Sequence, residues 1–274
     1  KIPEKTVKKI RQYMLEFAVM PSMRFLWSAG PAAEKDNTVI YNCSFAKLNC
    51  VEAFAECLHI LMCGTGFGFS VEEDEVSKLP SIPEIKSGKD IVREVIDDSR
   101  EGWADSVKTL MSSLYDGQNL YFDYSQLRPE GARLSTMGGR SSGPQPLIKL
   151  HDFIRETMHN AQGRKLTSLE CHDIANQIAE IVVAGGVRRS SQISLSDLND
   201  EDMRHAKDWP FPIRRAMANN SAIYREKPAA ADFLVEWGVL AKSGSGERGI
   251  FNLESAQNQA PARRYSSKIQ GTCL

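Results

Sequence analysis

Apolar residues recur along this chain with two spacings, and each spacing predicts a type of secondary structure. Val7, Ile10, Met14 and Phe17 would share one face of a helix over residues 4–19. The same spacing predicts further helices at 51–63, 101–115, 147–161, 167–183 and 229–242.

Polar residues mark where two of these helices should begin. Ser99 precedes the helix at 101–115 and is a favoured N-cap residue. Thr167 and Glu170 have the three-residue spacing of a capping box, in which each side chain accepts a hydrogen bond from the other's backbone. The helix at 167–183 should therefore start at this pair.

Strands are predicted where β-branched and aromatic residues cluster. These segments are 38–46, 119–124, 192–195 and 249–253, and the glycine-rich run 64–71 reads as a turn that enters another strand. Segments 72–92 and 128–146 have the composition of surface loops. Because strands alternate with helices, the fold class is predicted to be α/β with partly parallel strand pairing.

Composition excludes several classes of protein. The chain has 274 residues, of which 42% are hydrophobic and 25% charged, and its net charge is -1. This balance favours neither a nucleic-acid partner nor a membrane, since there is no basic excess and no apolar run reaches about 18 residues. The six cysteines match no zinc-site spacing, so no metal site is predicted and the expected location is the reducing cytoplasm.

Two short motifs could carry chemistry. Cys43, after Asn42, lies in a predicted strand, where a buried core cysteine is the simpler interpretation and a reactive thiol is the alternative. In Gly64-Thr65-Gly66-Phe67-Gly68, glycines would let a phosphate or ribose approach backbone N–H groups. A glycine-rich turn or β-bulge without any ligand explains these residues equally well.

Two loops could bind an anion or nucleotide. The first holds Gly139, Arg140 and Ser141, and the second holds Gly186 with Arg188 and Arg189. Arginines beside glycines and hydroxyls suit phosphate recognition. Alternatively, the first loop is only a surface loop, and the arginines of the second stabilise the end of a helix.

The order of these motifs resembles the barrel half of ribonucleotide reductase catalytic subunits along nearly the whole chain. The matching segments are Pro21-Ser22-Met23-Arg24, Asn42-Cys43-Ser44-Phe45, Gly64-Thr65-Gly66-Phe67-Gly68-Phe69-Ser70, Arg128-Pro129-Glu130-Gly131-Ala132, Gly138-Gly139-Arg140-Ser141-Ser142-Gly143-Pro144, Gly185-Gly186-Val187-Arg188-Arg189-Ser190, Asn219-Asn220-Ser221 and Gly249-Ile250-Phe251-Asn252-Leu253. The residues of these motifs are most similar to those of the class II, ribonucleoside-triphosphate reductase branch.

The resemblance implies a fold: the first half of a ten-stranded α/β barrel with an N-terminal helical segment. The implied domains are the helical segment at 1–20 and an incomplete barrel at 21–274, with an insertion on the surface or effector side at 72–120. The implied reaction is the reduction of ribonucleoside di- or triphosphates by a thiyl radical, with adenosylcobalamin as cofactor and a thioredoxin-like reductant.

The resemblance also gives residues their roles. Cys43 corresponds to one cysteine of the redox pair that reduces the substrate. The positions implied to face the substrate are Ser22, Asn42, Gly64, Thr65 and Gly66. The positions implied to relay a bound deoxynucleotide effector are Gly139, Arg140, Ser141, Gly186, Arg188 and Arg189.

The sequence departs from the family's pattern at Gly271-Thr272-Cys273-Leu274. Cys273 is either the thiyl cysteine in a divergent motif or the first residue of an intein, and an intein or split-gene junction is favoured because two expected residues are missing. The chain alone would then be inactive. Two alternatives remain: a nucleotide-binding fragment that a second polypeptide or protein splicing completes, and a class I subunit that uses a metal-containing partner.

Overall fold

The computed structural model describes residues 2–85, 93–134, 140–184, 191–244 and 246–261. Its contacts divide the chain into two units, Lys1–Asn42 and Cys43–Leu274. Within the described residues, no helix combines the length and apolar character needed to cross a bilayer.

The first unit is a series of short helices. Its elements are α1 (Glu4–Leu15), α2 (Met23–Ser28), α3 (Pro31–Lys35) and the 3-10 helix η1 (Asn37–Ile40). Ser22 begins α2, because its hydroxyl accepts a hydrogen bond from the N–H of Phe25 at 3.1 Å. The Nε of Arg24 donates to the carbonyl of Val39 at 2.8 Å and so ties α2 to η1.

A five-stranded, wholly parallel sheet organises the second unit. In spatial order its strands are β1 (Cys43–Lys47), β2 (Gly66–Ser70), β5 (Gln192–Asp197), β6 (Ala218–Tyr224) and β7 (Gly249–Asn252). Parallel neighbours need crossover connections, which helices commonly supply. The predicted α/β class is confirmed, and five parallel strands are the number expected of one half of a ten-stranded barrel.

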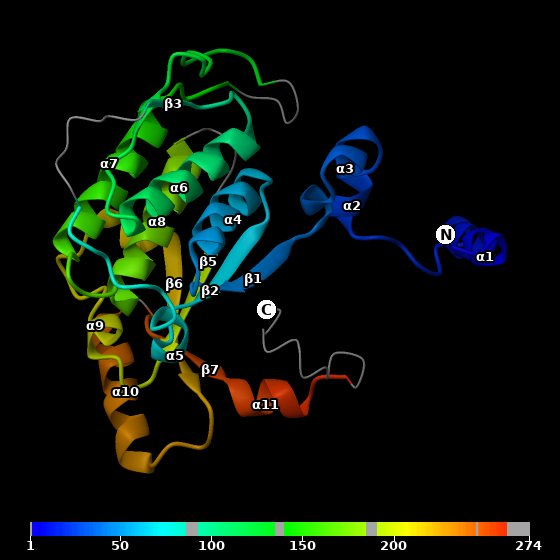
Figure 1. Cartoon of the computed structure of the whole chain (residues 1–274). Coiled ribbons are helices and arrows are strands. Elements are labelled where there is room, and N and C mark those ends of the chain that lie inside the picture. The colour runs from blue at the N-terminus through cyan, green and yellow to red at the C-terminus, as the bar shows by residue number, and fades with distance from the viewer. Residues whose placement is uncertain (1, 86–92, 135–139, 185–190, 245, 262–274) are drawn as a thin grey trace. The chain divides into compact units, whose positions relative to one another are not determined.

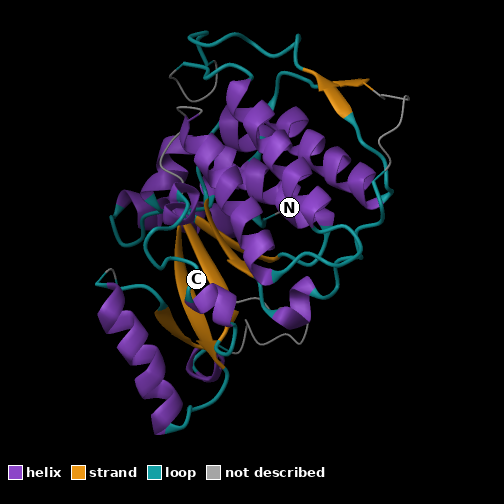
Figure 2. Cartoon of the chain, turned by 90° about the vertical axis from the view of Figure 1, so that its left-hand side faces the viewer, coloured by secondary structure: helices purple, strands orange, loops and turns teal. Residues whose placement is uncertain are grey.

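Helices fill the connections between these strands. They are α4 (Val51–Met62), α5 (Glu73–Val76), α6 (Arg100–Tyr115), α7 (Gln145–Asn160), α8 (Ser168–Ala184), α9 (Glu201–Arg204), the 3-10 helix η2 (Ile213–Met217), α10 (Ala230–Ser243) and α11 (Leu253–Asn258). A second, two-stranded sheet pairs β3 (Arg93–Val95) with β4 (Tyr121–Asp123). Figures 1 and 2 show α4, α6, α7 and α8 stacked together on one side of the main sheet.

The hydrophobic core lies between this helical layer and the sheet. Phe67 and Phe69 of β2 are fully buried there, against Phe54 and Leu58 of α4 among others. Side chains alternate between the two faces of a strand. Gly68, between the two phenylalanines, therefore faces away from these helices, as do its register partners Phe45 and Ile193.

The structure differs from the sequence prediction at two strands of the main sheet, β1 and β6. The strand expected at 38–46 begins only at Cys43, because the Asp36 carboxylate accepts from the N–H of Thr38 at 3.0 Å and favours a 3-10 turn there. Strand β6 was not predicted, since Asn219 and Asn220 interrupt its apolar pattern. Pairing with β5 and β7 makes this segment a strand.

Candidate active site

The predicted redox cysteine and the glycine motif meet at the amino-terminal end of the sheet. Cys43 is the first residue of β1 and is exposed, and it pairs in register with Gly66, the first residue of β2. The hydroxyl of Ser44 donates to the carbonyl of Gly66 at 2.9 Å, which fixes the two strands at this point. Residues 23 positions apart in sequence thus share one edge.

The turn before β2 is the C-terminal cap of α4. The N–H of Gly64 donates to the carbonyl of Leu61 at 2.8 Å, and the N–H of Thr65 donates to that of Ile60 at 3.2 Å. This pair of bonds is a Schellman motif, which needs a left-handed residue after the cap, and Gly64 has φ +75°. Gly64 therefore has a structural role, and Thr65 is buried.

The strand itself separates a core face from a site face. Register places Phe45, Gly68, Ile193 and Asn219 side by side across four strands, on the face that also carries Cys43. Gly66 adds no side chain to this face and is half-buried, so a ligand could approach the backbone there beside the thiol, whereas Gly68 is buried. Asn219 is exposed there and offers an amide.

Asn219 is a candidate that sequence reasoning had used only as a point of resemblance. In β6, Ala218 and Ala222 are buried, whereas the amide of Asn219 is exposed. This pattern marks Asn219 as a possible ligand contact only once the segment is known to be a strand.

The five described cysteines differ in exposure. Cys43 and Cys50 are exposed, whereas Cys57, Cys63 and Cys171 are buried. Burial raises the pKa of the thiols of Cys57 and Cys171 well above the usual range, which disfavours the reactive thiolate. These two side chains therefore behave as core residues.

The other predicted substrate positions belong to the first unit. The Ser22 hydroxyl caps α2, and Asn42 is the exposed residue immediately before Cys43. Cys273 lies outside the described residues.

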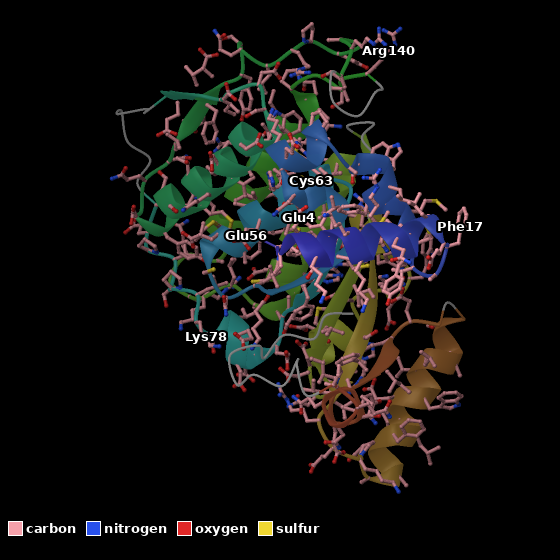
Figure 3. All side chains as sticks on the ribbon, turned by 90° about the vertical axis from the view of Figure 1, so that its right-hand side faces the viewer. Glu4, Phe17, Glu56, Cys63, Lys78 and Arg140 are labelled. Carbon is pink, nitrogen blue, oxygen red and sulfur yellow. The ribbon has the colours of Figure 1, made fainter. Side chains whose placement is uncertain are left out.

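Only part of the two predicted effector loops is described. Arg140 is exposed, as Figure 3 shows, and its Nη1 donates to the carbonyl of Gly131 at 2.9 Å. The backbone of Ser141 exchanges hydrogen bonds with Gly131 and Ala132, so this loop closes on itself. The remaining predicted positions, Gly139, Gly186, Arg188 and Arg189, lie outside the described residues.

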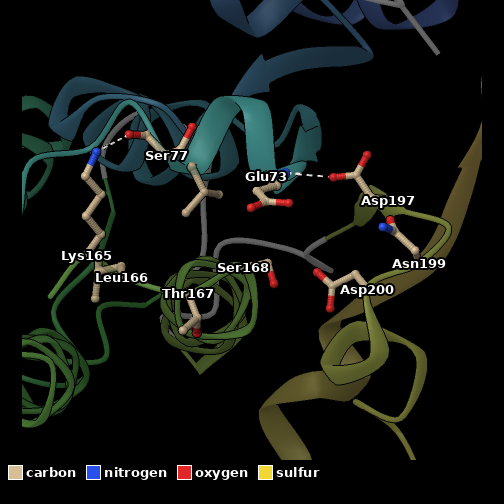
Figure 4. A pocket seen from close by; sticks show the side chains of 10 residues that line it. Glu73, Ser77, Lys165, Leu166, Thr167, Ser168, Asp197, Asn199 and Asp200 are labelled. Carbon is tan, nitrogen blue, oxygen red and sulfur yellow. Dashed lines mark hydrogen bonds between the residues drawn. The ribbon is translucent and has the colours of Figure 1, made fainter.

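A pocket of about 330 Å³ lies at the opposite, carboxyl end of the sheet (Figure 4). The carboxylate of Asp197 accepts there from the N–H of Glu73 at 2.7 Å, and that of Asp200 accepts from the N–H of Met203 at 2.9 Å. Lys165 donates to the carbonyl of Ser77. These groups already stabilise the fold, so we place the candidate chemistry at Cys43 instead.

The chain is similar to known proteins along most of its length. The family described as "B12-dependent ribonucleotide reductase, insertion domain" matches residues 73–158. An adenosylcobalamin-dependent ribonucleoside-triphosphate reductase of Lactobacillus gasseri is 28% identical over 96% of this chain and 43% of its own length. The enzymes of that name from Euglena gracilis and Levilactobacillus brevis are 30% and 31% identical over 77% and 72% of this chain, respectively.

One solved structure has a similar fold. It is the crystal structure of a B12-dependent (class II) ribonucleotide reductase, with a TM-score of 0.78 and 24% identity over 91% of this chain. This chain covers 42% of that protein and 43% of the Lactobacillus gasseri relative, which is less than half of either.

Proposed function

We propose that this chain, which belongs to the B12-dependent ribonucleotide reductases, is the substrate-holding part of an enzyme that reduces ribonucleotides to deoxyribonucleotides. The observation that carries this proposal is the exposed thiol of Cys43, in register with Gly66. The matched family and relatives are named for B12 or adenosylcobalamin, which favours class II over the class I alternative. The 274-residue chain alone is expected to be inactive.

Cys43 would supply one of the two thiols that reduce the substrate. In this reaction the ribonucleotide loses its 2′ oxygen as water, and two thiols lose two hydrogen atoms and become a disulfide. The second thiol must come within bonding distance, with the two Cα atoms about 4.4–6.8 Å apart. A thioredoxin-like dithiol would then restore both thiols, and the exposure of Cys43 suits that exchange.

The backbone beside Cys43 would hold the nucleotide. Gly64, Thr65 and Gly66 are proposed to meet its phosphate or ribose through the backbone, since the side chain of Thr65 is buried. Ser22 and Asn42 stay predicted substrate contacts.

Adenosylcobalamin is the proposed cofactor, since the matched family and relatives are named for B12 or adenosylcobalamin. The pocket beside Asp197 holds about 330 Å³ and an apolar groove on α1 about 430 Å³, volumes at the small end of ligand sites. Neither is large enough for a corrin, so we assign no described residue to the cofactor.

Effector response would involve the two predicted loops. Arg140 and Ser141 lie in a self-closed, exposed loop that could contact a deoxynucleotide phosphate. Gly139, Gly186, Arg188 and Arg189 are proposed to act with them. We further propose that the protein works in the reducing cytoplasm, where Cys43 would be regenerated as a thiol.

The test is Cys43→Ser in the completed enzyme, with Cys50→Ser as the matched exposed control. Multiple-turnover formation of deoxynucleotide with a dithiol reductant should fall to the background for Cys43→Ser and persist for Cys50→Ser. Sustained turnover by Cys43→Ser would refute the assigned role.

A nucleotide-binding fragment is the second candidate, because the substrate-facing backbone is present here while the radical chemistry would need the remaining part. Calorimetric titration of the isolated chain with a ribonucleotide measures binding, and an activity assay of the isolated chain with adenosylcobalamin and a thiol reductant distinguishes the two candidates. Binding without turnover, followed by turnover only on completion, is the expected result.

A further inference from the structure

Cys63 joins two helices through its buried sulfur. It caps α4, and its Sγ accepts a hydrogen bond from the Nη1 of Arg100 at 3.0 Å. The Nε2 of His59, one turn earlier in α4, lies 3.6 Å from the same sulfur. Arg100 is the first residue of α6. One side-chain contact therefore connects the end of α4 to the start of α6.

The position of Arg100 is unfavourable for α6 alone. A cation in the first turn of a helix opposes that helix's dipole, whereas a cation at the C-terminal end of a helix complements it. The Arg100 guanidinium reaches the C-terminal end of α4, where Cys63 lies. The contact with α4 thus explains why a cation occupies this place.

This contact lies directly before the glycine turn. Cys63 is bonded to Gly64, and the Schellman hydrogen bonds of Gly64 and Thr65 continue the same cap. Gly66 follows and pairs with Cys43. Because only two residues separate Cys63 from Gly66, a displacement of its sulfur would be passed to the loop through the backbone.

A second contact joins the same two helices at a different place. Lys108 of α6 forms an ion pair with Glu52 in the first turn of α4 at 3.1 Å, and both side chains are about half exposed. It lies at the end of α4 remote from Gly64. Lys108 therefore gives a matched comparison for Arg100.

We propose that Arg100 is a positioning residue that acts through Cys63 to hold the turn Gly64-Thr65-Gly66 against β1. Arg100 belongs to the segment 73–158 that matches the insertion-domain family. Through this link the insertion would set the geometry of the substrate-facing turn. The substrate-facing part of the inference rests on the proposed function, whereas the mechanical link does not.

Hydrogen exchange of the 274-residue chain tests the link. In Arg100→Gln and Cys63→Ala, the amides of Gly64 and Thr65 should exchange about tenfold faster than in the parent, because a charge-assisted hydrogen bond that supports the cap is lost. Lys108→Gln should leave them within about twofold. Arg100→Lys should restore part of the protection, since it keeps the charge.

Two outcomes would overturn the link: unchanged exchange in Arg100→Gln, or an equal increase in Lys108→Gln. If Cys63→Ala fails to fold, Arg100→Gln carries the test, since Arg100 is only half-buried.

In the completed enzyme, Arg100→Gln should raise the KM for the ribonucleotide about fivefold or more, with kcat within about twofold, because the turn binds and does not react. A completed enzyme that is inactive in its parent form contradicts the proposed function and leaves the exchange result standing. Faster exchange with an unchanged KM would refute the substrate-facing part alone.

Discussion

The imidazole of His151 should make the stability of this chain depend on pH. His151 lies on α7 and is fully buried. Its Nδ1 is 2.8 Å from the hydroxyl of Tyr124, and its Nε2 is 3.0 Å from the hydroxyl of Ser106. The Ser106 hydroxyl also donates to the carbonyl of Trp103 at 2.7 Å, so it accepts from Nε2–H and the neutral ring is fully satisfied.

The size of the effect follows from the pKa of His151. Burial, with a smaller contribution from the charge of Arg155, lowers this pKa to about 3. An unfolded histidine has a pKa of about 6.5, so between pH 6.5 and 3 the unfolded chain binds a proton that the folded chain does not. Stability therefore falls as the pH falls through this window, by about 2 kcal/mol between pH 7 and pH 5.

Urea unfolding of the parent and of His151→Gln at pH 7 and pH 5 measures this contribution. The variant should lose about 2 kcal/mol less than the parent over that interval, because its side chain does not titrate. Tyr124→Phe is the matched control: it keeps the imidazole, so it should lower stability by about 1 kcal/mol at pH 7 and keep the pH dependence. If the parent and His151→Gln lose stability in parallel, the assignment of the buried proton is wrong.

Three further predictions concern the Glu75 carboxylate, the turn at Gly64 and the reactivity of the cysteines. Burial alone would raise the pKa of the Glu75 carboxyl, but hydrogen bonds, the strongest from Lys47, outweigh burial and lower the pKa to about 2. The ionised carboxylate therefore stabilises the fold above about pH 4.5, and this contribution is lost as the pH falls towards 2. Glu75→Gln should therefore cost about 1–3 kcal/mol at pH 7 and little at pH 2.5, measured by urea unfolding. Gly64→Ala should cost about 1 kcal/mol, since φ +75° strains an alanine, and Gly64→Asn should cost less in the same assay. Iodoacetamide with peptide mapping should label Cys43 and spare Cys57 in the folded chain, and equal labelling of both would contradict the burial described.

Local signals in the sequence predicted the longer helices, whereas the short helices α2, α3, α5, α9 and α11 were not predicted. The capping box expected at α8 is present: the N–H of Thr167 donates to the Glu170 carboxylate at 2.9 Å, and the N–H of Glu170 donates to the Thr167 hydroxyl at 3.2 Å. Ser99 likewise caps α6 by accepting from the N–H of Gly102 at 2.9 Å. Each of these helix caps involves residues within a four-residue segment, so the local sequence is sufficient to predict it.

Strands depend on partners that are distant in sequence, so β3 and β6 were not predicted, although β2, β4, β5 and β7 were. Asn220 of β6 pairs with Ser194 of β5, and its N–H donates to the Glu247 carboxylate at 2.7 Å. No short window around Asn220 contains those groups. The pairing of Cys43 with Gly66 is equally non-local, so the sequence could name both residues without showing that they meet.

The glycines of the motif at 64–68 serve different physical needs, which explains why the motif was ambiguous in the sequence. Gly64 is required by the left-handed cap of α4, whatever the chain binds. Gly66 and Gly68 lie in a strand whose alternate residues, Phe67 and Phe69, fill the core. An ordinary strand would place side chains at 66 and 68 too, and β propensity disfavours glycine there. At position 66, which pairs with the exposed Cys43, the missing side chain leaves the backbone accessible, whereas Gly68 is buried and gives no such opening.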